Sequence, residues 1–238
     1  MFIIRKISKY LISKIATLKF LERLSQNKIW RKILEQKKPK IVSSANGKLN
    51  HDDWNKLLRY KVWDKVTEYI PFDKDILYLE FGVWQGVSIK YIAKKFTNKN
   101  SEFYGFDTFK GMPNKWRFLE KGHYSTSEEF PQTDDKRIKF FKGLFQDTLP
   151  VFLNKLSEES KNKIILIHFD CVLHSSTLYT LFKLSEHLDN YYFLFDELGT
   201  DECRAFNSFN DAKNKDYDLY LASKFNGAPE VVFGKFKN

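Results

Sequence analysis

The stretch Leu77–Ser88 constrains the fold of this chain more than any other. An apolar run leads into Glu80, two glycines follow at Gly82 and Gly86, and a helix-like segment begins near Ser88. A buried strand that turns through glycines into a helix is typical of α/β domains that bind nucleotide-like ligands, because the ligand can approach the backbone at the helix N-terminus. The stretch therefore predicts a first strand and loop, with Glu80 at the ligand edge of the sheet. A tight structural turn would also explain one glycine pair, so the assignment depends on the later strands.

Apolar strands alternate with helical segments along the rest of the chain. Strands are expected near 77–81, 102–107, 138–142, 164–170 and 191–197, and their continuous apolar runs are typical of a parallel sheet covered on both faces. Two last strands, near 217–222 and 230–234, are joined by a turn too short for a parallel crossover. The pattern predicts a doubly wound, mostly parallel seven-stranded α/β sheet of Rossmann-like type with an antiparallel last strand.

Positive charge is concentrated at the N-terminus. Residues 1–50 contain 13 Lys or Arg and 2 acids, whereas residues 51–238 contain 27 and 28. We therefore divide the chain into a basic amphipathic helical arm with a linker, 1–50, and a domain, 51–238. A domain close to neutrality argues against a nucleic-acid-binding face.

The arm has two interpretations. No apolar run approaches the roughly 20 residues that span a bilayer. Residues 1–25 could lie on an anionic membrane surface, or could pack on the domain or on a partner subunit in an oligomer. The two cysteines have neither metal nor disulfide spacing, which favours a reducing compartment. We expect a cytoplasmic protein, with any membrane contact being peripheral and on the inner face.

Two further positions suggest a binding site. Asp107 ends the second expected strand roughly 20 residues after Gly86, the spacing at which an acid reaches the ribose hydroxyls of an adenosine ligand. The long connection 108–135 is rich in turn residues and aromatics, and we interpret it as a lid over the substrate side. His123 lies within this lid, where a lone histidine is more often ordinary than catalytic.

Three acids follow two neighbouring strands. Asp170 comes after one strand, and Asp196 and Glu197 come after the next. Because carboxylates that converge need a cation or a proton between them, and because hard oxygen ligands favour magnesium, the sequence predicts a Mg²⁺ site here. In the competing interpretation Glu197 caps the next helix and only two acids face the site.

Five motifs in order resemble one family. They are Glu80–Ser88, Gly105–Pro113, Gly143–Pro150, His168–Thr177 and Phe195–Glu197. Together they resemble the macrocin O-methyltransferase family, class I enzymes that use S-adenosylmethionine (SAM) and whose characterised members methylate sugar hydroxyls with bound magnesium.

The resemblance assigns roles to individual residues. It implies that SAM is held by Glu80, Gly82, Gly86, Ser88 and Asp107, with Phe145 near the adenine. It also implies a small-molecule or glycan acceptor, as in polysaccharide, glycolipid or glycosylated-metabolite synthesis.

Val172 departs from the family pattern. The family has a second acid there, which would serve as the general base, and valine cannot take a proton. Either a metal alone ionises the acceptor, or His174 or His123 replaces the base. The remaining alternatives are a changed acceptor or a cofactor-binding protein that has lost catalysis. A dinucleotide oxidoreductase is disfavoured because the loop lacks the three-glycine spacing.

Overall fold

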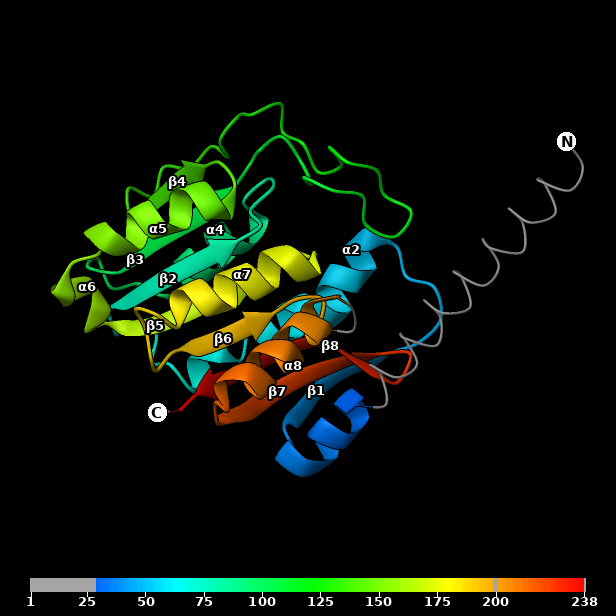
Figure 1. Cartoon of the computed structure of the whole chain (residues 1–238). Helices are drawn as coiled ribbons and strands as arrows, with labels where there is room; N and C mark the ends of the chain where they lie inside the picture. The colour runs from blue at the N-terminus through cyan, green and yellow to red at the C-terminus, as the bar shows by residue number, and fades with distance from the viewer. Residues whose placement is uncertain (1–28, 199–200, 238) are drawn as a thin grey trace, which may run out of the picture.

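The computed structural model describes residues 29–198 and 201–237, and the predicted membrane-contacting segment 1–25 lies outside them. One mixed sheet forms the centre of the molecule, with helices on both faces (Figure 1). Its strands are β1 (Lys40–Ala45), β2 (Ile76–Phe81), β3 (Glu102–Asp107), β4 (Ile138–Lys142), β5 (Ile164–Phe169), β6 (Tyr192–Phe195), β7 (Tyr217–Phe225) and β8 (Ala228–Phe236). Its helices include α2 (His51–Trp54), α3 (Tyr60–Trp63), α4 (Val87–Lys95), α5 (Phe145–Lys155), α6 (Glu158–Lys161), α7 (His174–Leu184) and α8 (Asp201–Lys213).

The sheet order is β1-β7-β8-β6-β5-β2-β3-β4, and β8 is antiparallel to both of its neighbours. The predicted doubly wound α/β architecture with a reversed last strand is therefore confirmed. From β2 at the centre, the chain adds β3 and then β4 toward one edge of the sheet. It then returns to the centre with β5, which lies beside β2, and continues toward the opposite edge. This arrangement brings the carboxyl ends of β2, β3, β5 and β6 to one edge of the sheet, where such folds bind ligands.

The sheet has eight strands rather than seven. The additional strand, β1, pairs in parallel with β7 at the edge of the sheet. It lies within the segment assigned to the arm and linker, so the boundary at residue 50 does not coincide with the edge of the sheet. The short, largely polar run of β1 after Lys-Lys-Pro resembles a linker, and only pairing with β7 makes it a strand.

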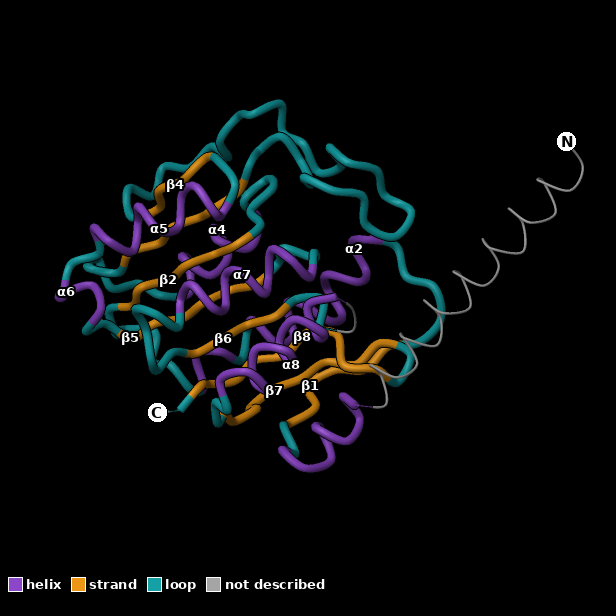
Figure 2. The backbone as a smooth tube through the Cα atoms, viewed as in Figure 1, coloured by secondary structure: helices purple, strands orange, loops and turns teal. Residues whose placement is uncertain are grey.

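The two faces of the sheet have separate apolar cores. One core packs α5, α7, α8 and the described helical residues 29–37 on the sheet, with Trp30 buried against Phe206. The other packs α4 and the helical run 51–70 on the opposite face. The tube in Figure 2 shows the segment between β3 and β4 as a long loop above the edge where the strands end. Within residues 29–198 and 201–237, no helix combines the length and apolar content required to cross a bilayer.

Candidate functional site

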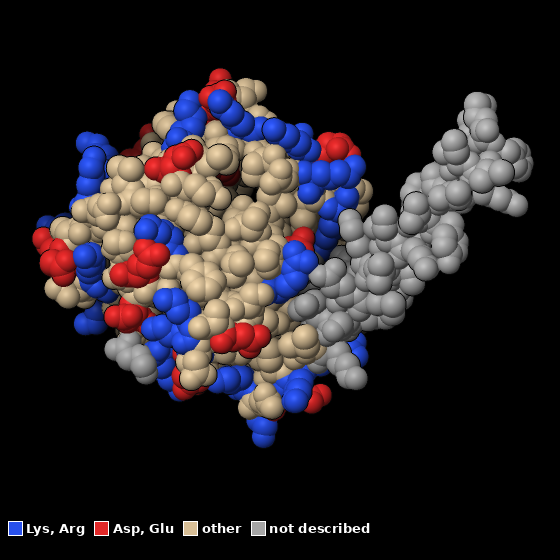
Figure 3. Space-filling view, viewed as in Figure 1, with Lys and Arg blue, Asp and Glu red and all other residues tan. Residues whose placement is uncertain are grey.

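A cavity of about 340 Å³ lies at the carboxyl ends of β2, β3, β5 and β6, and Figure 3 shows this side of the molecule hollowed beneath the loop that follows β3. Residues that directly follow these strands form its walls, as expected for a ligand site in an open α/β sheet. The lining residues include Gly82, Trp84, Asp107, Thr108, Tyr124, Phe145, Asp170, Val172 and Glu197, together with His51, Trp54 and Arg59 from the helical run before β2.

The two glycines after β2 have different surroundings. Gly82 lines the cavity at φ +92°, and a Cβ there would overlap the carbonyl oxygen of Asp170, so only glycine lets the ends of β2 and β5 come together. Gly86, at φ +70°, faces Pro131 of the 108–135 loop, which lies 2.8 Å from where its Cβ would be. Gly86 therefore provides room for that loop and is not among the described residues that line the cavity.

Asp107 connects β3 to the glycine loop. Its Oδ2 accepts hydrogen bonds from the backbone N–H groups of Val83 (2.8 Å) and Trp84 (2.9 Å), and its Oδ1 accepts from Phe109 (2.9 Å). A carboxylate has roughly four acceptor positions, so the three backbone bonds leave one for a ligand in the cavity. Asp107 lies in the cavity wall, as the spacing after Gly86 predicts.

Glu80 and Ser88 do not face the cavity. Both are buried, and Ser88 Oγ donates to Glu80 Oε1 at 2.8 Å, while the Tyr78 hydroxyl donates to Oε2. His168 Nδ1 lies 3.3 Å from the same Oε2. Neither residue is among the described residues that line the cavity, and a cofactor contact by Glu80 or Ser88 stays a prediction. Glu80 lies one residue inside β2, where it is covered, rather than at the strand end.

Charges alternate from Glu80 toward the cavity. His168 Nε2 lies 2.9 Å from Asp196 Oδ2, so this imidazole sits between two carboxylates. Burial disfavours the imidazolium, but Asp196 and Glu80 outweigh it and raise the pKa of His168 to about 10. Near neutral pH His168 is a buried cation that stabilises both acids and has no part in proton transfer to a ligand.

Arg59 continues this series. Its Nε lies 3.2 Å from Asp196 Oδ2, and its Nη2 lies 2.9 Å from Asp170 Oδ1. Its Cζ lies 4.5 Å from the ring centroid of Trp54. The residue ends a π-helical turn, Asn55–Arg59, and such turns are frequent at functional sites because they redirect side chains. Burial opposes its charge, yet Asp170 and Asp196 raise its pKa above the ordinary value.

The three acids Asp170, Asp196 and Glu197 do not fit the predicted magnesium site. Asp196 is fully buried, its Oδ1 accepts from Trp63 Nε1 at 3.0 Å, and its Oδ2 pairs with His168 and Arg59. The cation between Asp170 and Asp196 is therefore a guanidinium. Within the described residues, no three His, Cys, Asp or Glu side chains are grouped so as to hold a metal ion.

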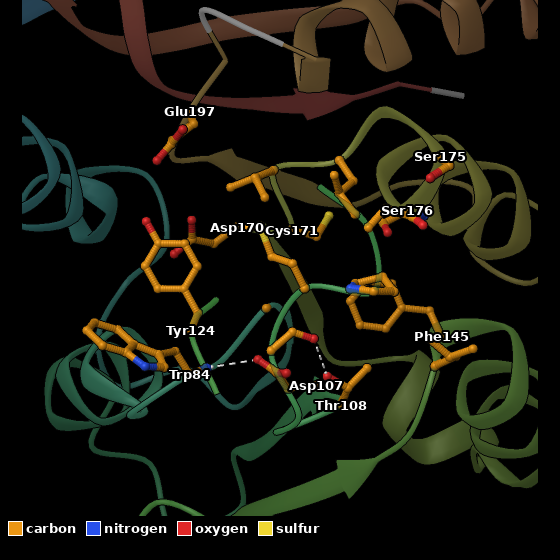
Figure 4. Close-up of a pocket in the computed structure, with 18 of the residues that line it drawn as sticks. Trp84, Asp107, Thr108, Tyr124, Phe145, Asp170, Cys171, Ser175, Ser176 and Glu197 are labelled. Carbon is orange, nitrogen blue, oxygen red and sulfur yellow. Dashed lines mark hydrogen bonds between the residues drawn. The ribbon is translucent and has the colours of Figure 1, made fainter. Parts of the chain in front are cut away.

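The cavity has two chemically distinct ends (Figure 4). The carboxyl groups of Asp170 and Glu197 and the hydroxyl of Tyr124 point toward one end, whereas Asp107, Thr108 and Phe145 lie at the other. Burial raises the pKa of both acids, although Arg59 acts in the opposite direction. Burial, with these two acids nearby, also raises the pKa of Tyr124, which keeps its phenol protonated near neutral pH. From the roles that the sequence predicts for Asp107 and for the acids, we name these the acceptor end and the cofactor end.

The model of the macrocin O-methyltransferase (TylF) family matches residues 56–222. The chain belongs to this family. It is therefore an enzyme that transfers methyl groups, and the resemblance carried by its five motifs is confirmed. No curated protein sequence matches the chain significantly.

Comparison with solved structures finds one with a similar fold at a TM-score above 0.5. The O-methyltransferase from Bacillus cereus in complex with SAH is 11% identical, with 90% of this chain and 91% of that chain covered and a TM-score of 0.51. The O-methyltransferase NovP is 18% identical over 72% of this chain and 74% of that chain, with a TM-score of 0.47. At these identities the similarity concerns the fold alone.

The two histidines proposed as bases for this methyltransferase are not among the described residues that line its cavity. His123 packs against the ring of Tyr124 at 4.4 Å, and it is Tyr124 that reaches the cavity. His174 begins α7, and its neighbours Leu173 and Ser175 face the cavity instead. The loop 108–135 therefore contributes Tyr124 to the cavity wall, and catalysis by His123 or His174 stays a prediction.

Val172 and Phe145 both line the cavity. Val172 lies three residues after β5, and Phe145 is the first residue of α5. Val172 has a left-handed backbone, φ +49°, and its N–H donates to Glu202 Oε1 at 3.0 Å. The loop is thus held in a fixed, strained conformation at the position where the family has an acid.

Sequence reasoning missed Arg59, Trp54, His51, Trp84 and Tyr124. The first three precede β2 in a helix whose apolar periodicity indicates only packing on the sheet. The signal available for Trp84 was its position between Gly82 and Gly86 of the expected ligand loop. The structure adds a φ of +48°, a strained backbone for a bulky residue that is typical of functional sites.

Proposed function

We propose that this enzyme transfers a methyl group from SAM to a hydroxyl of a sugar in a glycan, glycolipid or glycosylated metabolite. The observation that carries the proposal is a single cavity with a carboxylate suited to a ribose at one end and aromatic side chains with carboxylates at the other. SAM supplies an electrophilic methyl group on a sulfonium, and the protein contributes binding, alignment and control of the acceptor proton.

The cofactor end suits an adenosyl group. Asp107 retains an acceptor position toward the cavity, which supports its assignment to the ribose hydroxyls. Phe145, Met112 and Leu144 provide apolar walls for the adenine. Gly82 lines the cavity at the point where the ends of β2 and β5 meet. Burial raises the pKa of Asp170 and of Glu197 because it removes water that would stabilise their negative charges. The positively charged sulfonium of SAM, bound nearby, would stabilise these carboxylates.

The acceptor end suits a hydroxylated ring. Trp84 and Tyr124 pack edge to face, with ring centroids 5.4 Å apart, and Trp54 lines the same cavity. Aromatic faces bind the C–H faces of a sugar ring, while carboxylates such as Glu197 accept hydrogen bonds from its hydroxyls. We do not include magnesium in this proposal, because Arg59 already pairs with two of the three predicted ligands.

Calorimetry with SAM and with S-adenosylhomocysteine tests the cofactor end. Asp107→Ala removes the ribose acceptor, and the loss of one hydrogen bond to a charged group, about 1.5 to 3 kcal/mol, should weaken binding roughly 10- to 150-fold. Asp147→Asn, an exposed acid in the first turn of α5, is the matched control and should bind as wild type does. Wild-type affinity in Asp107→Ala would overturn the ribose assignment.

A second candidate function is a cofactor-binding protein that no longer catalyses transfer, and Val172 in the cavity wall is the observation that favours it. Tritiated SAM with a panel of methyl glycosides separates the two. We expect the wild type to label a glycoside. A wild type that binds SAM without transfer, together with a Val172→Asp variant that gains transfer, would favour the non-catalytic alternative.

A further inference from the structure

O-methyl transfer releases a proton from the acceptor, and the cavity must contain a group that takes it. Val172 cannot, and His174 and His123 are not among the described residues lining the cavity. All five histidines of the chain lie in its described part, and of these His51 lines the cavity. An imidazole is the side chain most often used to accept a proton near neutral pH.

The contacts of His51 place its ring at the acceptor end. His51 is the first residue of α2, whose start is held by Asn50, with Oδ1 accepting from the N–H of Asp53 at 2.8 Å. The imidazole packs edge-on against Trp84, with centroids 6.2 Å apart and an interplanar angle of 88°. The Asn55 amide nitrogen lies beside the ring, 3.3 Å from Nδ1 and 3.4 Å from Nε2. Because Trp84 also packs on Tyr124, His51 belongs to the aromatic wall that we assign to the acceptor.

Other groups in the cavity wall are less suited to take the proton. Asp107 lies at the cofactor end and accepts three backbone hydrogen bonds. Asp170 is paired with Arg59. Burial raises the pKa of the Cys171 thiol and of the Tyr124 phenol, so both stay protonated near neutral pH.

Charged side chains lie on two sides of His51. Asp52 Oδ1 lies 3.9 Å from Nδ1 on the same helix. Glu197 lines the same cavity, and its pKa is raised by burial and lowered in part by Arg59 and by His51. Arg59 directs its guanidinium to Asp170 and Asp196.

We propose that His51 is the general base of this methyltransferase, an inference that rests on the O-methyl transfer proposed above. As the methyl carbon leaves the sulfonium sulfur and bonds to the acceptor oxygen, the acceptor O–H bond breaks and its proton passes to a ring nitrogen of His51. The sulfur keeps the electron pair of the broken C–S bond, giving S-adenosylhomocysteine. The side chain of His51 is 60% exposed, so the imidazolium can release its proton to water.

The test compares wild type with His51→Ala and with His187→Ala, a control histidine beyond the end of α7 that does not line the cavity. Transfer from tritiated SAM to methyl glycosides is measured across pH, and SAM affinity is measured by calorimetry. We expect His51→Ala to slow transfer roughly 10²- to 10⁴-fold with unchanged SAM affinity. Added imidazole should restore part of the rate, and His187→Ala should behave as wild type does.

Two results would overturn the assignment. One is a wild-type rate and pH profile in His51→Ala, which would leave Glu197 as the base. The other is a slowed variant that imidazole does not rescue and that also loses SAM affinity or melting temperature, which would make His51 a structural residue. A wild type that binds SAM but labels no glycoside would instead be a failure of the proposed function, because that result does not depend on residue 51.

Discussion

Replacing Arg59 by methionine removes the cation that joins Asp170 and Asp196 while keeping an unbranched apolar stem of similar length. The side chain of Arg59 is only 13% exposed, and Asp196 is fully buried, so water cannot replace the lost charge. Breaking a buried ion pair by removing one partner costs about 3 to 5 kcal/mol. Asp196 keeps its contacts with His168 and Trp63, which puts the expected loss near the lower limit, about 3 kcal/mol.

Urea unfolding followed by tryptophan fluorescence, together with thermal melting, measures this loss. For a chain of this size about 3 kcal/mol corresponds to a decrease in Tm of roughly 6 to 12 °C. Lys65→Met is the control, because it removes an ion pair with Glu68 in which both side chains are well exposed, and it should cost less than about 1 kcal/mol.

A double variant separates charge from packing. The double variant Arg59→Met with Asp170→Asn also removes the charge of one of the two carboxylates that Arg59 pairs with. Its loss of unfolding free energy should therefore be smaller, by about 0.5 to 3 kcal/mol, than the sum of the losses in the two single variants. If Arg59→Met were no more destabilising than Lys65→Met, or if the two changes were simply additive, the alternating charges would not stabilise the site.

Three further predictions concern the same region. Because the pKa of His168 is raised to about 10 in the folded protein, its imidazolium stabilises the fold fully below the unfolded value of about 6.5, and this stabilisation is lost as pH rises through about 10. In His168→Asn, Tm should therefore fall less than in the wild type between these two pH values. Gly82→Ala, whose Cβ overlaps a carbonyl oxygen, should lower Tm and SAM affinity, whereas Gly47→Ala, with a similar φ of +88° and nothing within 4 Å, should cost only about 1 kcal/mol in unfolding experiments. Because Arg59 is the cation between two of the three predicted ligands, dialysis against a chelator should leave Tm unchanged, and a rise of several degrees on adding Mg²⁺ would contradict this arrangement.

Strand ends could be predicted from the sequence because the apolar runs stop abruptly. Asp107 is the last residue of β3 and Asp170 directly follows β5, and both reach the cavity as expected. Glu80 lies one position before the end of β2, because Phe81 continues the strand, and its carboxylate is buried inside the sheet. The position of the last residue of a strand therefore decides whether an acid faces the cavity, as Asp107 does, or packs beside a histidine inside the sheet, as Glu80 does.

The sequence alone could not show which element covers each face of the sheet. Glu80 and His168 are paired in register between β2 and β5, so their side chains share a face. That face is packed by the helical run 51–70, which supplies Arg59 and Trp63 to Asp196. Nothing in the periodicity of that helix indicates that a π-helical turn directs a guanidinium toward the strand ends, so the acids seemed to need a metal.

The two ends of the cavity are built by different parts of the chain. The cofactor end comes from the loops after β2, β3 and β4, which are tied to the sheet by the backbone hydrogen bonds of Asp107. Much of the acceptor end comes from the helical run before β2 and from the lid residue Tyr124. Because Trp84 contacts both His51 and Tyr124, it joins these two parts through aromatic packing rather than through the sheet. Under the proposed function, changes in the helical run or the lid would therefore alter which hydroxyl is presented to the methyl group without altering the cofactor end.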